Sequence, residues 1–148
     1  MPATKQSLTS IHGRRVGLAQ DGKLVVNGRT AVTQDDTGAF LRIQGAPATV
    51  DATATMLAAD LLKGLVTSTS AAAVAATVPT GTLLDAAAGL AIGEAFDWSL
   101  INTGAVNAVT VTAGAGHTLV GNAVVALSSS GRFRSRKTAA NTFVTYRL

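Results

Sequence analysis

The sequence predicts an all-β protein with mainly antiparallel strands, built as a jelly-roll-like sandwich or barrel with one or two short helices and an extended N-terminal arm. The main observation is a period of two between apolar and polar residues in segment 95–121, which is rich in β-branched and aromatic residues. Gly and Asn residues interrupt the same segment at intervals typical of turns between strands. Phe96 and Trp98 share one side of an extended chain, and because Trp98 is the only tryptophan we expect this pair to anchor the core.

The length and composition favour one domain that associates with copies of itself. The chain has 148 residues, of which 47% are hydrophobic but only 4% are aromatic. A core of Ala, Val and Leu gains about 1.5–3 kcal/mol for each large side chain that it buries, and much less for each Ala. Because a small domain with such a core is marginally stable alone, we expect a homo-oligomer, which buries more surface. The chain has no cysteine, which excludes disulfides and thiolate metal sites and suits a reducing cytoplasm.

Charge is distributed unevenly along the chain, whose formal net charge is +4. Residues 1–42 carry six basic and three acidic side chains, residues 43–131 carry one and five, and residues 132–148 carry five and none. Segments 64–84 and 98–131 contain no charge, but their many small polar residues exclude a membrane span, so no membrane is expected as a partner. Uncharged surfaces of this kind are typical of subunit contacts.

Two regions are expected, an extended arm over residues 1–45 and a β-sandwich or barrel body over residues 46–148. Apolar residues are sparse in the arm. The turn signals Asp21-Gly22 and Asn27-Gly28 around segment 23–26 are compatible with one short hairpin. The arm is either a terminus without fixed structure or a segment that orders on a neighbouring protein.

Two short helices are expected in the body. The first is suited to capping by Thr55 and to ending at Gly64. For the second we expect Thr82 as the cap, Asp85 in the position of a capping box, and Gly89 as the end.

The other segments of the body are interpreted as strands separated by turns. The expected strands occupy residues 65–78, 95–101, 109–112, 124–127, 132–136 and 142–148. Segment 114–121, with the sequence GAGHTLVG, is interpreted as a hairpin turn, because it lacks the spacing of a phosphate-binding loop. Residues 128–131 are expected to form another turn.

No combination of residues predicts catalysis or metal binding. His12 and His117 have no acidic neighbours with which to form a metal site or a triad. Asp97 is on the opposite face of its strand from Trp98, which argues against a saccharide site, and no two carboxylates can be placed across a sugar-sized cleft. We therefore expect a protein that is not an enzyme and that holds neither a cofactor nor a metal.

A row of arginines is the most specific chemical feature. In a strand, Arg132, Arg134 and Arg136 share one face, with Phe133 and Ser135 on the other. This row is either a solvated face with scattered salt bridges, a contact to another subunit or protein, or a nucleic-acid site, the last being disfavoured because no stacking platform of aromatic residues is evident. The candidate contact residues for another protein or for a second subunit are Arg14, Arg15, Arg29, Arg132, Arg134, Arg136 and Lys137.

Several stretches of the body are informative when taken together: LAADLLKGLV (57–66), ATVPTGTLLDAA (76–87), GEAFDWSLINTG (93–104), VTVTAGAGHTLVG (109–121) and the closing FRSRKT and TFVTYRL. Together they resemble the capsid decoration, or cement, proteins of tailed bacteriophages. The resemblance makes the basic residues named above candidate contacts to the capsid. The resemblance implies a self-associating body, often a trimer, that clamps neighbouring hexamers of the major capsid protein. It also implies a protein made in the host cytoplasm and located on the outer surface of the capsid in the virion.

The expected function is therefore a structural virion protein that decorates and stabilises a phage capsid by bridging major capsid protein subunits. The expected partners are the major capsid protein and further copies of this chain, with a homotrimer favoured over a dimer, whereas nucleic acid is not expected. The alternative is a tail-associated or fibre-associated receptor-binding module that recognises a host surface glycan.

Overall fold

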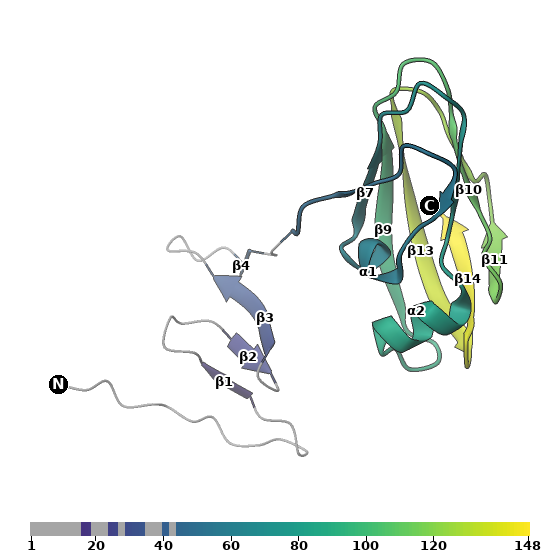
Figure 1. Ribbon diagram of the computed structural model, residues 1–148. Helices are drawn as coiled ribbons and strands as arrows, with labels where there is room; N and C mark the ends of the chain where they lie inside the picture. The colour runs from purple at the N-terminus through teal and green to yellow at the C-terminus, as the bar shows by residue number, and fades with distance from the viewer. Residues whose placement is uncertain (1–15, 19–23, 27–28, 35–39, 42–43) are drawn as a thin grey trace. The chain divides into compact units, whose positions relative to one another are not determined.

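The computed structural model describes residues 44–148 continuously and, before them, the four strand segments 16–18, 24–26, 29–34 and 40–41. The chain divides into two units, residues 1–44 and residues 45–148 (Figure 1). Each sheet described below belongs to one of these two units.

The described strands of the first unit form a small sheet in which every pairing is antiparallel. In sheet order they are β1 (Val16–Leu18), β2 (Leu24–Val26), β3 (Arg29–Gln34) and β4 (Phe40–Leu41). Strand β2 lies between the two turn signals of the sequence and pairs with both β1 and β3. The segment thus contains more strand pairs than the one hairpin that the sequence indicated. Its expected docking on a neighbouring protein stays a prediction.

The second unit has two sheets around one core, with two short helices (Figure 1). The six-stranded sheet contains, in sheet order, β11 (His117–Val120), β14 (Thr142–Arg147), β13 (Ser129–Ala139), β9 (Ala95–Asn102), β7 (Leu65–Ser68) and β5 (Ala48–Thr49). The four-stranded sheet contains β12 (Val124–Val125), β10 (Val109–Thr112), β8 (Val74–Thr77) and β6 (Ala54–Thr55). The helices are α1 (Ala58–Leu62) and α2 (Gly81–Ala88).

The expected fold class is wrong, because the strands run in mixed directions. The architecture is mixed α/β, with 45% strand and 12% helix within residues 44–148, rather than an antiparallel jelly roll or barrel. The pairs β9–β13, β13–β14 and β10–β12 are antiparallel. The parallel pairs are β5–β7, β7–β9, β6–β8, β8–β10 and β11–β14.

The connections explain this mixture. From β5 to β13, each successive strand lies in the opposite sheet. After two consecutive crossings the chain is back in the sheet that it left, and it runs in the same direction as before. Strands β5, β7 and β9 are therefore parallel, as are β6, β8 and β10. A period of two shows that a strand has one buried face, and this pattern is the same for both pairing directions. The sequence pattern therefore could not reveal the parallel pairs.

Three further expectations are wrong, the first two because the chain crosses between the sheets. Strands β10 and β11 belong to different sheets, so the chain after Thr112 crosses between sheets instead of closing a hairpin. The expected single strand 65–78 is divided into β7 and β8, one in each sheet. Most of the expected turn 128–131 belongs to β13, which begins directly after Ser128, a residue with a φ of 48°.

Both helices are present, but they begin at other residues than expected. Thr80 caps α2, because its side-chain oxygen accepts a backbone N–H of the first turn at 3.3 Å, whereas the expected cap, Thr82, lies inside the helix. Gly89 ends α2 with a φ of 62°, as predicted. Helix α1 begins after Leu57 without a side-chain cap, since the expected cap, Thr55, belongs to β6.

The core between the sheets contains Trp98 of β9, which is 1% exposed. Its ring stacks on Phe133 of β13 with the centroids 4.5 Å apart. Its Nε1 donates to the hydroxyl of Ser135 at 3.0 Å, and that hydroxyl lies 2.9 Å from the hydroxyl of Thr145. Phe96 is partly buried and packs against this core. The other fully buried apolar side chains come from both sheets, from the helices and from the connection after β8: Leu61, Val66, Ala76, Val78, Leu84, Leu100, Val109, Val111, Val125 and Phe143.

A buried amide joins several connections at the end of β9. The side chain of Asn102 donates to the carbonyls of Asn107 at 2.9 Å and of Ala126 at 3.1 Å. Its Oδ1 accepts the N–H of Gly104 at 3.0 Å. The same amide therefore holds the β9–β10 connection and the segment that leads into β13.

Candidate functional site

The feature most suited to recognition is a group of charged side chains on the outer face of the six-stranded sheet. The alternation along β13 buries every second side chain and exposes Arg132, Arg134 and Arg136. On the neighbouring strand β9, Trp98 is buried, whereas Asp97 projects to the same surface as the arginines. We call Asp97, Arg132, Arg134 and Arg136 the basic face.

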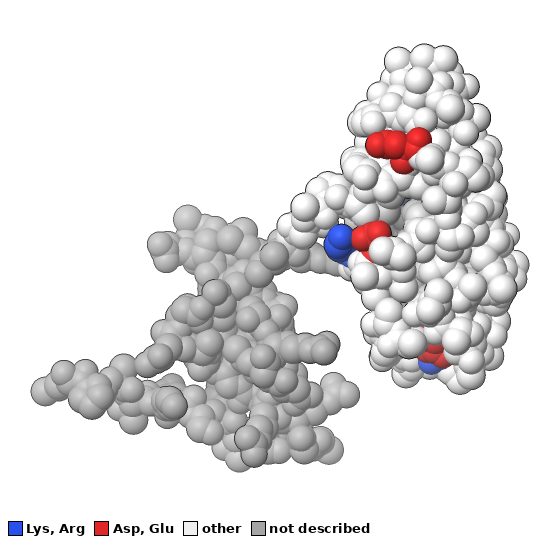
Figure 2. Space-filling view, viewed as in Figure 1, with Lys and Arg blue, Asp and Glu red and all other residues white. Residues whose placement is uncertain are grey.

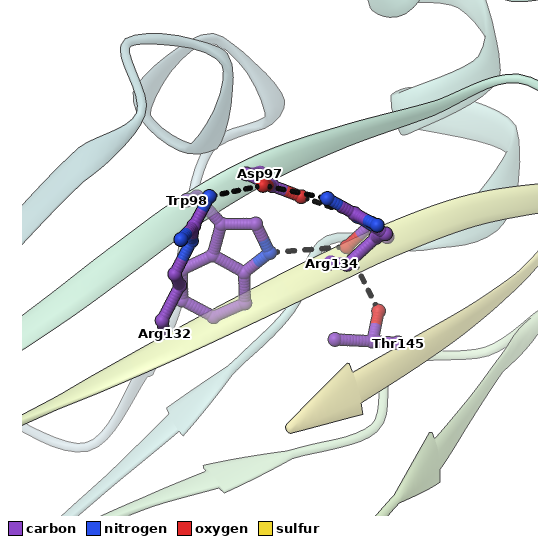
Figure 3. A network of polar contacts seen from close by, with 6 residues as sticks. Asp97, Trp98, Arg132, Arg134 and Thr145 are labelled. Carbon is purple, nitrogen blue, oxygen red and sulfur yellow. Dashed lines mark hydrogen bonds and ion pairs between the residues drawn. The ribbon is translucent and has the colours of Figure 1, made fainter. Parts of the chain in front are cut away.

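Asp97 lies between two of these arginines and binds both (Figure 3). Arg134 donates from Nε to Oδ1 at 2.6 Å and from Nη2 to Oδ2 at 2.9 Å, and Arg132 donates from Nη2 to Oδ2 at 2.7 Å. Such charge-assisted bonds favour the ionised carboxylate, and those from Arg134 above all lower the pKa of Asp97 to about 2. The side chains of Arg132 and Arg134 are 63% and 49% exposed, so a partner can reach them.

Arg136 differs from the other two arginines. Within residues 44–148, its guanidinium takes part in no hydrogen bond or ion pair. In the β13–β14 register it is opposite Val144, and Arg134 is opposite Tyr146. Both of these β14 side chains are partly exposed, so apolar and aromatic groups border the cations on one side.

Lys137, which the sequence grouped with the arginines, is used inside the unit. Its side chain is 13% exposed, and Nζ bonds to the carboxylate of Asp85 and, at 2.9 Å, to the carbonyl of Leu90. Asp85 also accepts the N–H of Asn141 at 2.9 Å, and the bond from Lys137, followed by that from Asn141, lowers the pKa of Asp85. Lys137 therefore fastens α2 to the β13–β14 hairpin and is not part of the basic face.

The remaining expected contact residues belong to the first unit. Arg14 and Arg15 lie outside the described residues. Arg29 begins β3, but its side chain also lies outside what the structure describes.

The sequence does not identify Asp97 as the partner of the arginines. That assignment depends on the β9–β13 register, in which Asp97 is directly opposite Arg134. The available signal was the presence of opposite charges on two expected strands, since Asp97 lies 35 residues before Arg132 and 37 before Arg134. Many other registers between these strands were compatible with that signal.

A second charged residue, Arg147, lies on the inner side of β14 and was also missed. Its guanidinium carbon is 5.0 Å from the ring centroid of Phe133, within the range of a cation–π contact, and its Nη2 donates to the carbonyl of Ser130 at 3.1 Å. Gly131 makes room for this group, because a Cβ there would lie 1.4 Å from Nη1. The available signal was that Arg147 lies two positions after Thr145, which is buried, and therefore on the same face of the strand.

The four-stranded sheet differs from the basic face in its chemistry. None of its strands contains a charged residue. On its partly exposed positions lie Thr77 and Thr112, whose hydroxyls are 2.7 Å apart, and Val124, which is 43% exposed. The side of the second unit visible in Figure 2 is also white over most of its area, with charged side chains confined to a few small groups.

The described residues contain no candidate metal site. In residues 44–148, as in the four described strands before them, no three His, Asp or Glu side chains come together to hold a metal ion. His117 stacks on Phe143 with the centroids 5.4 Å apart, neither of its ring nitrogens has a hydrogen-bond partner in the described part of the chain, and burial lowers its pKa. The stacked imidazole fills space beside Phe143, and no side chain of the described residues is positioned as its hydrogen-bond partner.

Neither helix in the described part of the chain has the length and apolar character needed to cross a bilayer. No protein-family model, curated protein or solved structure matches this chain.

Proposed function

We propose that this protein is a non-catalytic structural virion protein, which decorates a phage capsid and stabilises it by bridging major capsid protein subunits. The observation that carries the proposal is the basic face: three exposed arginines on one strand, two of them held by Asp97, with no group of metal-ligating side chains in the described residues. Side chains held on a sheet offer fixed donors to a partner surface, which suits binding rather than turnover. The sequence resemblance to capsid decoration proteins supports the same function.

The two sheets of the second unit are suited to two different contacts. In the proposal, the basic face of the six-stranded sheet contacts the outer surface of the capsid. The uncharged four-stranded sheet contacts other copies of the chain, with a homotrimer favoured over a dimer. Charge depletion supports this assignment, because the centres of subunit interfaces contain few charged groups.

Bridging several capsid subunits makes weak individual contacts sufficient. A trimer presents three copies of the basic face, and once one copy binds, the others bind at a high effective concentration. Small contacts per copy therefore add up to stable decoration, provided that the capsid repeats its sites with matching geometry.

Co-sedimentation of the purified protein with expanded heads assembled without it tests this function. We expect saturable binding at a fixed ratio to the major capsid protein, and weaker binding as salt is raised. A protein that does not bind heads, and that occurs instead at low copy number on tails and binds host surface glycan, would refute the proposal and support a receptor-binding module.

A further inference from the structure

The basic face is not a uniform row of positive charge. Its three guanidinium groups and one carboxylate leave a net charge of +2. Asp97 occupies two donor groups of Arg134 and one of Arg132. A guanidinium has five N–H donors, so Arg132 keeps most of its donors, and Arg136 keeps all of them with respect to residues 44–148.

The donors that stay free are concentrated at the two ends of the basic face. Arg132 and Arg136 are four residues apart on one strand, a separation of about 13 Å. Arg134 lies between them, and its charge is balanced by Asp97. The pattern along the strand is therefore positive, neutral and positive.

We propose that the basic face binds a protein partner through discrete carboxylates, received by Arg132 and Arg136, and that Asp97 excludes nucleic acid from the same face. This inference rests on the proposed function, in which the partner is the capsid shell. It adds the chemistry of the contact and assigns Asp97 a role in selectivity.

The exclusion of nucleic acid follows from the regular spacing of phosphates. Duplex DNA carries one phosphate per strand every 3.4 Å along its axis, so a backbone that follows β13 from Arg132 to Arg136 must pass Asp97. The carboxylate there repels phosphates and already occupies the central arginine. Discrete carboxylates about 13 Å apart avoid Asp97, and a built-in repulsive group of this kind is a usual source of specificity. Proteins that bind single-stranded nucleic acid stack successive bases on several aromatic side chains. In the β13–β14 register a single tyrosine, Tyr146, borders the arginines, which is too little for such a platform.

The described acidic residues of a second copy do not match this pattern. Asp60, Asp85 and Asp97 are neutralised by cations of their own chain. The other two, Asp51 and Glu94, each accept a backbone N–H and lie on separate segments rather than four apart on one strand. Among the described residues, a second copy thus offers no matching pair of carboxylates, which favours another protein as the partner, in keeping with a contact to the shell.

The border of the basic face suits a protein surface as well. Next to Arg134 lies Tyr146, and next to Tyr146 on β11 lies Val120, which is 46% exposed. Arginine and tyrosine side chains beside exposed aliphatic groups are the composition that protein interfaces favour.

The first experiment tests Asp97 with duplex DNA as the probe. Asp97→Asn keeps the shape of the side chain, frees the donors of Arg134 and raises the net charge of the face. We expect the wild-type protein to show no binding to a short duplex in a mobility-shift assay at 0.15 M salt. The variant should bind about three- to tenfold more tightly than wild type at low salt, with a salt slope steeper by about 0.9 for each added phosphate contact. Fluorescence of Trp98 serves as the control for folding.

The second experiment tests the partner's chemistry with expanded heads. We expect that amidation of the head carboxylates with a carbodiimide and a neutral amine abolishes binding, whereas nuclease treatment leaves binding unchanged. Arg136→Ala should weaken binding by about tenfold, within the range for a charge-assisted contact. The matched control is Lys63→Ala, which removes an exposed cation of another element and should leave binding unchanged.

The outcomes separate this inference from the proposed function. Heads that bind the protein equally well after amidation, or that bind Arg136→Ala as tightly as wild type, refute the carboxylate contact and leave decoration standing. Tight DNA binding by wild type, or no gain in Asp97→Asn, refutes the role of Asp97. Failure of the unmodified protein to bind heads refutes the proposed function, and the DNA comparison still decides whether Asp97 provides selectivity.

Discussion

Replacing Trp98 with alanine should severely destabilise the second unit. Trp98 is 1% exposed and stacks on Phe133, so the substitution removes a buried aromatic ring and leaves a cavity between the sheets. Truncation of a buried Trp or Phe to Ala costs about 3–5 kcal/mol, and the lost stacking accounts for about 0.5–1.5 kcal/mol of this. The hydroxyl of Ser135 loses the indole as a donor but keeps Thr145, so no further penalty for an unsatisfied group is expected.

The loss is large compared with the stability of a small domain. Native domains unfold with a free energy of about 5–15 kcal/mol, and the predominance of Ala and Val in this core favours the lower end of that range. Trp98→Ala is therefore expected to lose a third or more of the free energy of unfolding. Trp98→Phe keeps an aromatic ring against Phe133 and should lose only about 1–2 kcal/mol.

Urea unfolding followed by far-ultraviolet circular dichroism measures these changes, since the variants lack the tryptophan that fluorescence would report. The matched control is Ile92→Ala, because Ile92 is 67% exposed and its loss should change the free energy by less than about 0.5 kcal/mol. If Trp98→Ala lowers the free energy of unfolding by less than about 1 kcal/mol with an unchanged slope against urea, Trp98 does not lie in the core between these sheets.

Three further predictions concern pH, packing and a buried amide. Burial lowers the pKa of His117 in the folded state below the 6.5 of the unfolded chain, so unfolding near and below that pH takes up a proton. The free energy of unfolding should therefore fall from pH 7 to pH 5, and a His117→Leu variant with the same pH dependence would refute this. Gly81→Ala should destabilise by about 1–3 kcal/mol, because its Cβ would lie 2.0 Å from the carbonyl oxygen of Asn141, whereas Gly89→Ala has open space and should cost about 1 kcal/mol for its left-handed backbone. A Gly81→Ala variant with the thermal midpoint of the wild type would contradict the packing of α2 against Asn141. Asn102→Ala should cost about 1–3 kcal/mol in urea unfolding through the carbonyls that it leaves unsatisfied, and a loss below about 0.5 kcal/mol would show that this amide is not buried.

Features that depend on neighbouring residues along the chain could be predicted from the sequence. The exposure of Arg132, Arg134 and Arg136 follows from the period of two, because successive side chains of any extended strand point to opposite faces. The burial of Trp98 and the exposure of Asp97 follow in the same way. The end of α2 at Gly89 follows from the left-handed backbone that glycine adopts at low cost.

Features that join distant segments were decided by the tertiary structure. Lys137 continues the same strand as the arginines, yet it binds Asp85 of a helix more than fifty positions earlier, because packing of α2 against the hairpin brings the two together. The capping-box prediction at Thr82 and Asp85 was wrong for the same reason, since Asp85 bonds to Lys137 and Asn141 instead of closing its own helix end.

The sequence by itself thus determined which side of β9 and β13 is apolar, where the arginines are exposed, and where the second helix ends. Only the tertiary structure decided that the chain crosses between two sheets at nearly every connection, that many pairs are therefore parallel, and that Asp97 lies between two arginines. The physical reason is that side-chain alternation depends on local backbone geometry alone. Pairing direction and register depend instead on where each connection returns the chain.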